Sequence, residues 1–211
     1  RNFQAVRAVT GDAVEVMPVV KADAYRHGAV EVSQALEAQG ARWLAVSNAA
    51  EGAALREAGI GTRILVMADF LPSEREALVE YNLTPVLHEL DMIPEWDAVA
   101  RETGLRLSYH LKLDSGMGRL GTRASASTIA GAIQAAQTVD CEGLMTHFAS
   151  AADYESGQTE SQISHFAKVR TALARAGIEP KFAHLSSTTP IAYGRREAWG
   201  NMVRPGHAIY G

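Results

Sequence analysis

Cysteine is nearly absent from this 211-residue chain, in which Cys141 is the only one. A single thiol excludes a disulfide within the chain, and a reducing compartment is then its simplest environment. We therefore expect a cytoplasmic protein. No apolar run approaches the ~20 residues that a membrane-spanning helix needs, and no secretory signal is visible, so we expect no membrane partner.

Positive charge is not in excess either. A net charge of −4 at pH 7 offers no surface for a polyanion, so we expect no nucleic-acid partner. The seven histidines show no HExxH-like spacing, and no metal site is predicted. A hydrolase elbow GxSxG is missing as well. The glycines of "GMGRLG" (116–121) have dinucleotide-loop spacing, but no convincing ribose carboxylate follows them.

What is present is an alternation of apolar, β-branched runs with helical patterns. Eight runs predict strands, at residues 17–22, 43–47, 63–68, 84–88, 107–113, 141–148, 181–186 and 201–211. Helical patterns lie between them, at residues 1–11, 29–40, 48–59, 73–82, 125–137 and 158–177. Strands that are apolar throughout, rather than at alternate positions, are typical of a parallel sheet covered by helices.

Eight strands of this kind predict an α/β fold, a (β/α)₈ TIM barrel formed by residues 1–211 as one domain. A doubly wound open sheet is the alternative. The chain starts at Arg1 without a methionine and stops on the eighth predicted strand. We therefore expect a piece of a longer protein, truncated after that strand.

Polar residues at the ends of the predicted strands are candidates for chemistry, because barrel active sites form at the carboxyl ends of the strands. Lys21 ends the apolar run of "PVVKADAYRHG", where a lysine is costly unless it is solvated, paired or chemically used. Further along the chain the candidates are Arg119 in "HLKLDSGMGRLG", His147 in "MTHFAS", Ser187 in "HLSSTTP" and Arg204 in "VRPGHAIYG".

Together these residues suggest one cofactor. An apolar surrounding favours the neutral amine of Lys21, which can form a Schiff base. The Ser187 hydroxyl and the amides of Gly206 and His207 could hold a phosphate at the corner where this fold usually binds one. A Schiff-base lysine with a phosphate seat points to pyridoxal 5′-phosphate. Taken singly, these residues have ordinary structural explanations, and Tyr25 could be a half-buried aromatic residue.

Four motifs, "VVKADAYRHG", "LKLDSGMGRLG", "MTHFAS" and "MVRPGHAIYG", resemble those of the alanine racemase family, the fold-type III pyridoxal phosphate enzymes. The resemblance runs along the whole chain and covers the N-terminal barrel of that family. It implies an isomerase that interconverts L- and D-alanine by exchange of the α-proton, in D-amino-acid biosynthesis for the cell wall. It also implies an amino-acid substrate and a homodimer.

The resemblance assigns roles at the matching positions. Lys21 would be the Schiff-base lysine and the proton-transfer base on one face of the substrate. Tyr25 would contact the cofactor phosphate, together with Ser187 and the amides of Gly206 and His207.

The basic residues receive roles in the same way. Arg204 would face the pyridine nitrogen and keep it unprotonated, with His147 bonded behind it. Arg119 would bond the cofactor phenolate and lie near the substrate carboxylate. Lys112 matches a lysine that is carbamylated in many relatives and orients this arginine.

The chain departs from the family pattern at several positions. Arg26 stands where glycine is usual, Ser186 replaces asparagine, and His207 replaces an aliphatic residue. Threonines follow Ser187 where alanines are commoner. No residue matches the tyrosine that acts on the opposite substrate face, which the family's C-terminal β domain supplies. The alternatives are a racemase for serine or another amino acid, a fold-type III decarboxylase or dehydratase, and a non-catalytic cofactor-binding module.

Overall fold

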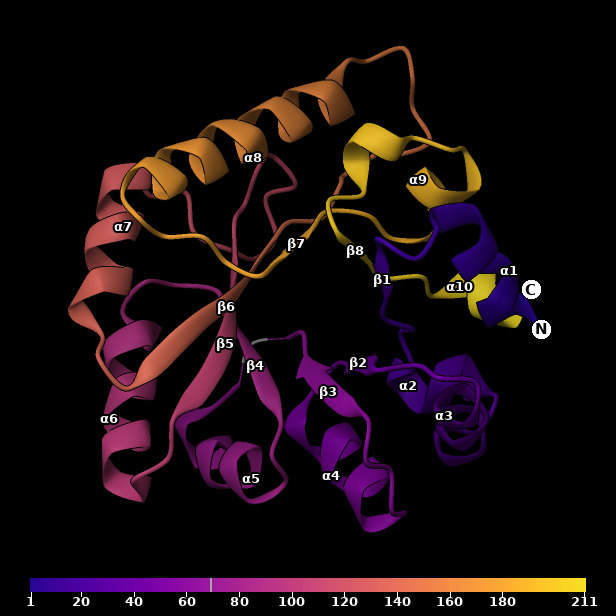
Figure 1. The fold of residues 1–211 in the computed structure, drawn as a ribbon, viewed down its shortest axis with the longest axis horizontal. Helices are drawn as coiled ribbons and strands as arrows, with labels where there is room; N and C mark the ends of the chain where they lie inside the picture. The colour runs from indigo at the N-terminus through magenta and orange to yellow at the C-terminus, as the bar shows by residue number, and fades with distance from the viewer. Residues whose placement is uncertain (69) are drawn as a thin grey trace. The chain divides into compact units, whose positions relative to one another are not determined.

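The computed structural model describes residues 1–68 and 70–211. The chain forms two compact units, one made of Arg1–Val86 with Ser186–Gly211 and the other of Leu87–Leu185. Each unit alternates parallel strands with helices (Figure 1), as the sequence predicts for an α/β protein.

The first unit is built on parallel strands that pair in short registers. Strand β1 (Glu15–Val16) pairs with β8 (Met202–Val203), and β2 (Trp43–Val46) pairs with β3 (Arg63–Val66), which pairs with β4 (Thr84–Leu87). A bridge between Val19 and Ala45 extends the first strand beside β2. Every residue of β2 is buried, which accounts for its continuous apolar sequence.

The helices of the first unit lie before, between and after its strands. They are α1 (Asn2–Thr10), α2 (Lys21–Arg26), α3 (Ala29–Ala38), α4 (Ala49–Glu57), η1 (Pro72–Glu74), α5 (Arg75–Glu80), α9 (Thr188–Ala192), η2 (Arg196–Ala198) and α10 (His207–Tyr210). The two ends of the chain lie side by side (Figure 1), where the Asn2 side-chain amide donates to the Ile209 carbonyl at 3.0 Å.

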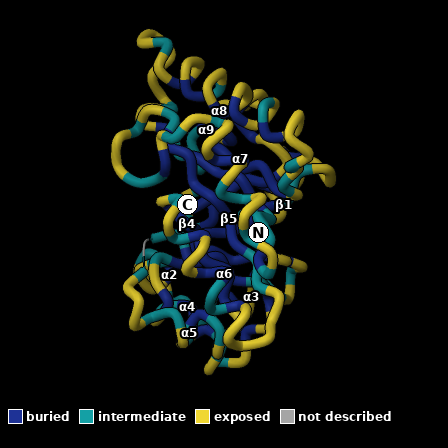
Figure 2. The backbone as a smooth tube through the Cα atoms, turned by 90° about the vertical axis from the view of Figure 1, so that its left-hand side faces the viewer, coloured by how far each residue is buried: buried dark blue, intermediate teal, exposed yellow. Residues whose placement is uncertain are grey.

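The second unit holds β5 (Leu107–Lys112), β6 (Val139–Met145) and β7 (Phe182–His184), which pair in parallel in that order. Its helices α6 (Met92–Thr103), α7 (Ala126–Ala135) and α8 (Gln158–Arg175) pack side by side along these strands (Figure 1). In each unit the strands are buried and the outward turns of the helices are exposed (Figure 2).

The structure corrects several predicted boundaries. The first strand was expected at 17–22, but β1 covers Glu15–Val16 and Lys21 already begins α2. The last was expected at 201–211, but β8 covers Met202–Val203 and His207–Tyr210 is helical. Barrel strands need few paired residues before the chain turns into a loop, and an apolar run does not reveal where pairing stops.

Candidate active site

The segment that follows the first strand has an unusual backbone. Residues Ala22 to Arg26 all have positive φ, between 51° and 68°. Consecutive residues other than glycine rarely adopt this left-handed conformation, which costs roughly 1–2 kcal/mol for each residue. Strain of this kind persists only where the surroundings enforce it, and it concentrates at functional sites. The turn therefore marks the residues on either side of it as candidates.

Several contacts stabilise the far end of the left-handed turn. The Asp23 carboxylate accepts the N–H of Ala29 at 2.7 Å, at the first residue of α3. The His27 ring nitrogen lies 2.9 Å from the Ala24 carbonyl, and Ala24 itself is fully buried. The turn is thus tied to the helix that follows it.

Lys21 lies at the start of this turn and is half-buried. Within residues 1–68 and 70–211, its side chain has no hydrogen bond or ion pair. An amine that has no partner among these residues is available to react with a carbonyl group.

Backbone hydrogen bonds bring three strand ends together in the first unit. The Val19 N–H donates to the Pro205 carbonyl at 2.9 Å, and the Arg204 N–H donates to the Ser186 carbonyl at 3.0 Å. The segments that carry Lys21, Ser187 and Arg204 are therefore neighbours, although they are far apart in the sequence.

Tyr25 packs against the segment that follows β8. Its ring centroid lies 5.1 Å from that of His207 and 5.2 Å from that of Tyr210. A methyl group added at Gly206 would lie 2.6 Å from the Tyr25 hydroxyl oxygen, so only glycine permits this approach. Burial raises the pKa of Tyr25 above its usual value, and the phenol therefore stays protonated at neutral pH and can donate a hydrogen bond.

Two backbone amides converge on one hydroxyl beside this tyrosine. The N–H groups of Gly206 and Ala208 donate to Thr188 Oγ1 at 3.1 and 3.2 Å. Ser187 precedes Thr188, is half-buried and does not use its side chain to cap α9. Thr188 Oγ1 accepts both amides, so the hydroxyl hydrogens of Thr188 and Ser187 are the donors that this cluster leaves for an anion. The Gly206 amide was predicted there, whereas Thr188 and Ala208 were not.

Arg204 is a buried cation of the first unit, with 2% of its surface exposed. Burial lowers the pKa of Arg204 to about 9. This value is still above 7, so the guanidinium remains charged at neutral pH.

The loop that carries Arg119 lies in the second unit and closes back on β5. The Lys112 carbonyl accepts the Thr122 N–H at 3.0 Å, and the Asp114 N–H donates to the Thr122 carbonyl at 3.0 Å. Gly121 has a φ of 111°, and a methyl group there would lie 2.8 Å from the Asp114 nitrogen. Lys112 is buried and Arg119 is exposed.

Asp114 organises the same loop. Its carboxylate accepts the N–H groups of Gly116 and Gly118 at 3.1 and 2.9 Å and pairs with Arg123 at 2.6 Å. Burial acts to raise the pKa of Asp114, but the Gly118 amide, Arg123 and the Gly116 amide outweigh it and hold the pKa below its usual value. The carboxylate therefore stays ionised at neutral pH.

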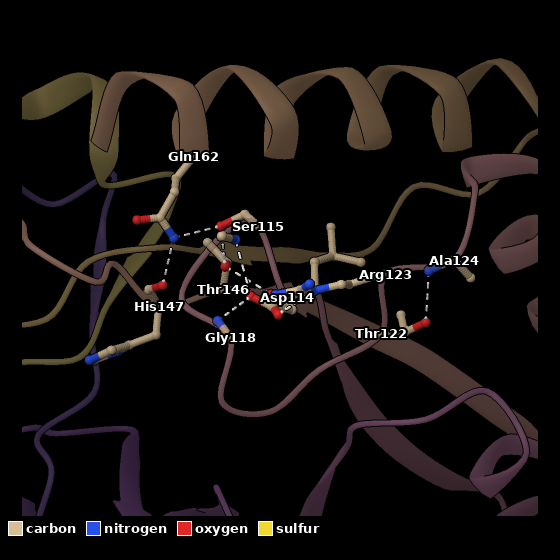
Figure 3. A network of polar contacts seen from close by, with 11 residues as sticks. Asp114, Ser115, Gly118, Thr122, Arg123, Ala124, Thr146, His147 and Gln162 are labelled. Atoms are coloured by element: carbon tan, nitrogen blue, oxygen red, sulfur yellow. Dashed lines mark hydrogen bonds and ion pairs between the residues drawn. The ribbon is translucent and has the colours of Figure 1, made fainter. Parts of the chain in front are cut away.

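Gln162 of α8 connects the loop after β5 to the end of β6 (Figure 3). Its side-chain amide donates to Ser115 Oγ and to the His147 carbonyl, both at 3.0 Å, and accepts the Ala149 N–H at 3.0 Å. Thr146 Oγ1 lies 2.7 Å from Ser115 Oγ. Gln162 is 1% exposed, so this network fixes the backbone on both sides of His147.

The predicted residues are therefore divided between the two units. The first unit brings together Lys21, Tyr25, Ser187, Arg204, Gly206 and His207, and the second holds Lys112, Arg119 and His147. Sequence reasoning missed Glu51, Thr188 and Gln162, which bind backbone groups of these segments. Only Thr188 carried a signal, as a departure from the alanine usual in relatives.

The described part of the chain shows neither a metal cluster nor a membrane-spanning helix. Within residues 1–68 and 70–211, no three His, Cys, Asp or Glu side chains are placed to share an ion. No helix in these ranges combines the length and apolar character that a bilayer span requires.

Comparison with known proteins finds the same family by sequence profile and by individual relatives. The profile of the family described as alanine racemase, N-terminal domain, matches residues 1–211. A curated alanine racemase of Carboxydothermus hydrogenoformans is 39% identical over 210 residues, covering 100% of this chain and 56% of that protein. One of Halothermothrix orenii is 36% identical over 211 residues, covering 100% of this chain and 55% of that protein.

Solved structures agree over the same range. Alanine racemase of Clostridium difficile 630, in complex with cycloserine, matches with a TM-score of 0.94 at 30% identity, covering 100% of this chain and 58% of that one. The enzyme from D-cycloserine-producing Streptomyces lavendulae matches with a TM-score of 0.92 at 30% identity, covering 100% and 56%. The predicted barrel class is thereby confirmed, and the chain spans little more than half the length of these relatives.

Proposed function

The chain belongs to the alanine racemase N-terminal domain family, and on this premise we propose that it binds pyridoxal 5′-phosphate and forms the barrel part, residues 1–211, of an amino-acid racemase. Alanine is the proposed substrate, since the curated relatives are alanine racemases. The dimeric state and the cytoplasmic location of the whole protein belong to the same proposal.

The residues of the first unit fit this cofactor. Its phosphate needs hydrogen-bond donors, and the Tyr25 hydroxyl is one. This hydroxyl lies so close to the Gly206 backbone that a side chain on Gly206 would clash with it. Its aldehyde needs an amine without a competing partner. The Lys21 amine has none among residues 1–68 and 70–211. The buried, charged guanidinium of Arg204 is the partner that an unprotonated ring nitrogen requires.

Bound pyridoxal phosphate supplies the electron-withdrawing ring that makes the α-proton of an amino acid acidic. The Lys21 amine then removes this proton on one face and returns it. The Tyr25 and Ser187 hydroxyls and the His207 amide would hold the phosphate, whereas the Gly206 amide, which was predicted with them, already donates to Thr188 Oγ1.

In the second unit, Arg119 is proposed to bind the substrate carboxylate. The roles of Lys112, which would orient Arg119, and of His147, which would bond behind Arg204, remain predictions. The buried network of Asp114 and Gln162 holds the backbone of both segments (Figure 3).

A guanidinium at the position of Arg204 favours racemisation over the alternatives, whereas a carboxylate there would favour them. Although burial lowers the pKa of Arg204 to about 9, this value is still above neutral pH, so the guanidinium keeps its proton beside the ring nitrogen. Beside Arg204 the ring nitrogen would stay unprotonated, which would favour simple return of the α-proton over decarboxylation or elimination.

The unpartnered amine of Lys21 is the observation that carries the proposal, and labelling tests it. We expect borohydride reduction in the presence of pyridoxal phosphate to attach one pyridoxyl group, located on Lys21 by peptide mass spectrometry. Lys21→Ala should abolish this label, and the exposed Lys168→Ala should retain it. Equal labelling of several surface lysines, or a label retained in Lys21→Ala, would overturn the assignment.

A further inference from the structure

Glu51 joins the ends of the first two strands through backbone hydrogen bonds. It lies in the first turn of α4, and its Oε1 accepts the Ala22 N–H at 2.7 Å. Its Oε2 accepts the Ser47 N–H, also at 2.7 Å. Both carboxylate oxygens are thus used on segments outside the helix.

Helix capping alone does not require this arrangement. Asn48 already caps α4, since its side chain accepts the Glu51 N–H at 2.9 Å. In a capping box, an acidic residue at this position would turn back to the N–H of the cap residue itself. Glu51 instead binds the residue before the cap and, 29 positions away in the sequence, Ala22.

The bond to Ala22 acts on Lys21 directly. The N–H of Ala22 and the carbonyl of Lys21 belong to one planar peptide group. Fixing this N–H therefore fixes the orientation of the peptide that follows Lys21, and with it the direction in which the lysine side chain leaves the backbone. Ala22 is also the first residue of the strained left-handed turn, with φ 51° and ψ 52°.

We propose that Glu51 is a positioning residue for Lys21, which holds the left-handed turn in place and aims the amine at the cofactor. The expected effect on cofactor attachment rests on the proposed function, but the positioning of Lys21 itself does not need a cofactor. The exposed residue Glu57 of the same helix is a matched control, because among residues 1–68 and 70–211 its side chain binds only the Tyr81 hydroxyl, at 2.8 Å.

The first measurement is amide hydrogen exchange by NMR on the full 211-residue chain without cofactor. Glu51→Gln keeps the side-chain length but replaces one acceptor oxygen with a donor. We expect exchange at Ala22, Ser47 or both to become about tenfold faster or more, while Glu57→Gln leaves these amides unchanged. Glu51→Asp, which keeps the charge but is too short to span both partners, should act in the same direction.

The second measurement is the rate at which pyridoxal phosphate becomes attached to Lys21, followed by absorbance and verified by borohydride labelling. We expect an attachment about tenfold slower in Glu51→Gln and a rate like that of the wild type in Glu57→Gln. Thermal unfolding of each variant separates this effect from global destabilisation. If Glu51→Gln does not fold, Glu51→Asp provides both measurements.

The outcomes separate the two hypotheses. If the wild-type chain takes up no cofactor at Lys21, the proposed function fails, and the exchange measurement still decides whether Glu51 holds the turn. Unchanged exchange at both Ala22 and Ser47 overturns the inference. Faster exchange with an unchanged attachment rate also overturns it, because Glu51 would then stabilise the loop without positioning the lysine.

Discussion

Arg26 is exposed and is the last residue of the left-handed turn, with a φ of 68°. Glycine adopts this conformation without the steric cost that a side chain imposes, although it also loses more entropy on folding. We expect Arg26→Gly to raise the free energy of unfolding by up to about 1 kcal/mol, measured by urea denaturation.

The control lies in a right-handed helix. Arg170 is also exposed and lies inside α8, where replacement by glycine should lower the free energy of unfolding by about 1 kcal/mol. Opposite signs for the two substitutions are the test. If both lower the stability equally, the backbone at Arg26 is not left-handed in solution.

At the scale of elements, buried or half-buried polar side chains tie helices to the points where strands begin. Glu37 of α3 accepts the N–H groups of Gly61 and Thr62 at 2.9 and 2.7 Å, just before β3. Arg56 of α4 donates to the Tyr81 carbonyl at 2.9 Å, before β4. Each bond satisfies backbone groups that the sheet leaves unpaired.

Asp97 of α6 does the same in the second unit. Its carboxylate accepts the N–H groups of Gln137 and Thr138 at 3.0 and 2.7 Å and the Thr138 hydroxyl at 2.6 Å, before β6. It also pairs with Arg101. The Thr138 hydroxyl, more than offsetting the effect of burial, lowers the pKa of Asp97 below its usual value.

We therefore expect Asp97→Asn to lower the free energy of unfolding at pH 7 by about 1–2 kcal/mol, through the loss of charge-assisted bonds. A depressed pKa in the folded state stabilises the protein above the ordinary aspartate range, and this contribution is lost as the pH falls. The difference from the wild type should thus shrink below a pH of about 4. Urea denaturation of both proteins at pH values from about 3 to about 7 measures this difference in the free energy of unfolding.

A matched variant is Asp12→Asn, because the Asp12 side chain is fully exposed and lies 3.7 Å from Arg7. Exposed pairs contribute little, so this variant should unfold like the wild type at every pH. A difference between Asp97→Asn and the wild type that persists unchanged into acid would contradict the assignment of the effect to ionised Asp97.

The elements with regular patterns were predictable from the sequence, and the irregular ones were not. The strand expected at 107–113 is β5, Leu107–Lys112. Helix α6 was missed because Pro94 interrupts its pattern, but it lies in the first turn, where a proline loses no helical hydrogen bond. The left-handed turn after Lys21 has no sequence signature, because it is imposed by contacts with distant residues such as Glu51.

At the scale of the whole molecule, sequence motifs predicted which residues gather in the first unit. Lys21, Tyr25 and Arg204 lie on segments that are joined by backbone hydrogen bonds or ring contacts. The residues that hold these segments were missed because a carboxylate or hydroxyl that binds backbone groups has no characteristic spacing. The proposed ligand-binding positions lie in short motifs that can be recognised one by one, whereas the contacts that support them depend on the completed fold.

The proposed role of Lys21 predicts how the 211-residue chain reacts with alanine. Lys21 is the one side chain proposed to remove the α-proton, and it acts from a single face of the substrate. A single base returns the proton to the face from which it came, so configuration is retained, whereas racemisation requires a second group on the opposite face. The chain should therefore exchange the α-proton of one alanine enantiomer without inverting it.

This is measured by incubating the chain with pyridoxal phosphate and either L- or D-alanine in D₂O. Mass spectrometry should show deuterium entering one enantiomer, and chiral chromatography should show little conversion into the other. Lys21→Ala should abolish the exchange, whereas Arg119→Ala should reduce it mainly by raising the amino-acid concentration required, because that side chain is assigned to the substrate carboxylate. Full racemisation by this chain would reveal a second base among its own residues and would contradict a one-sided mechanism.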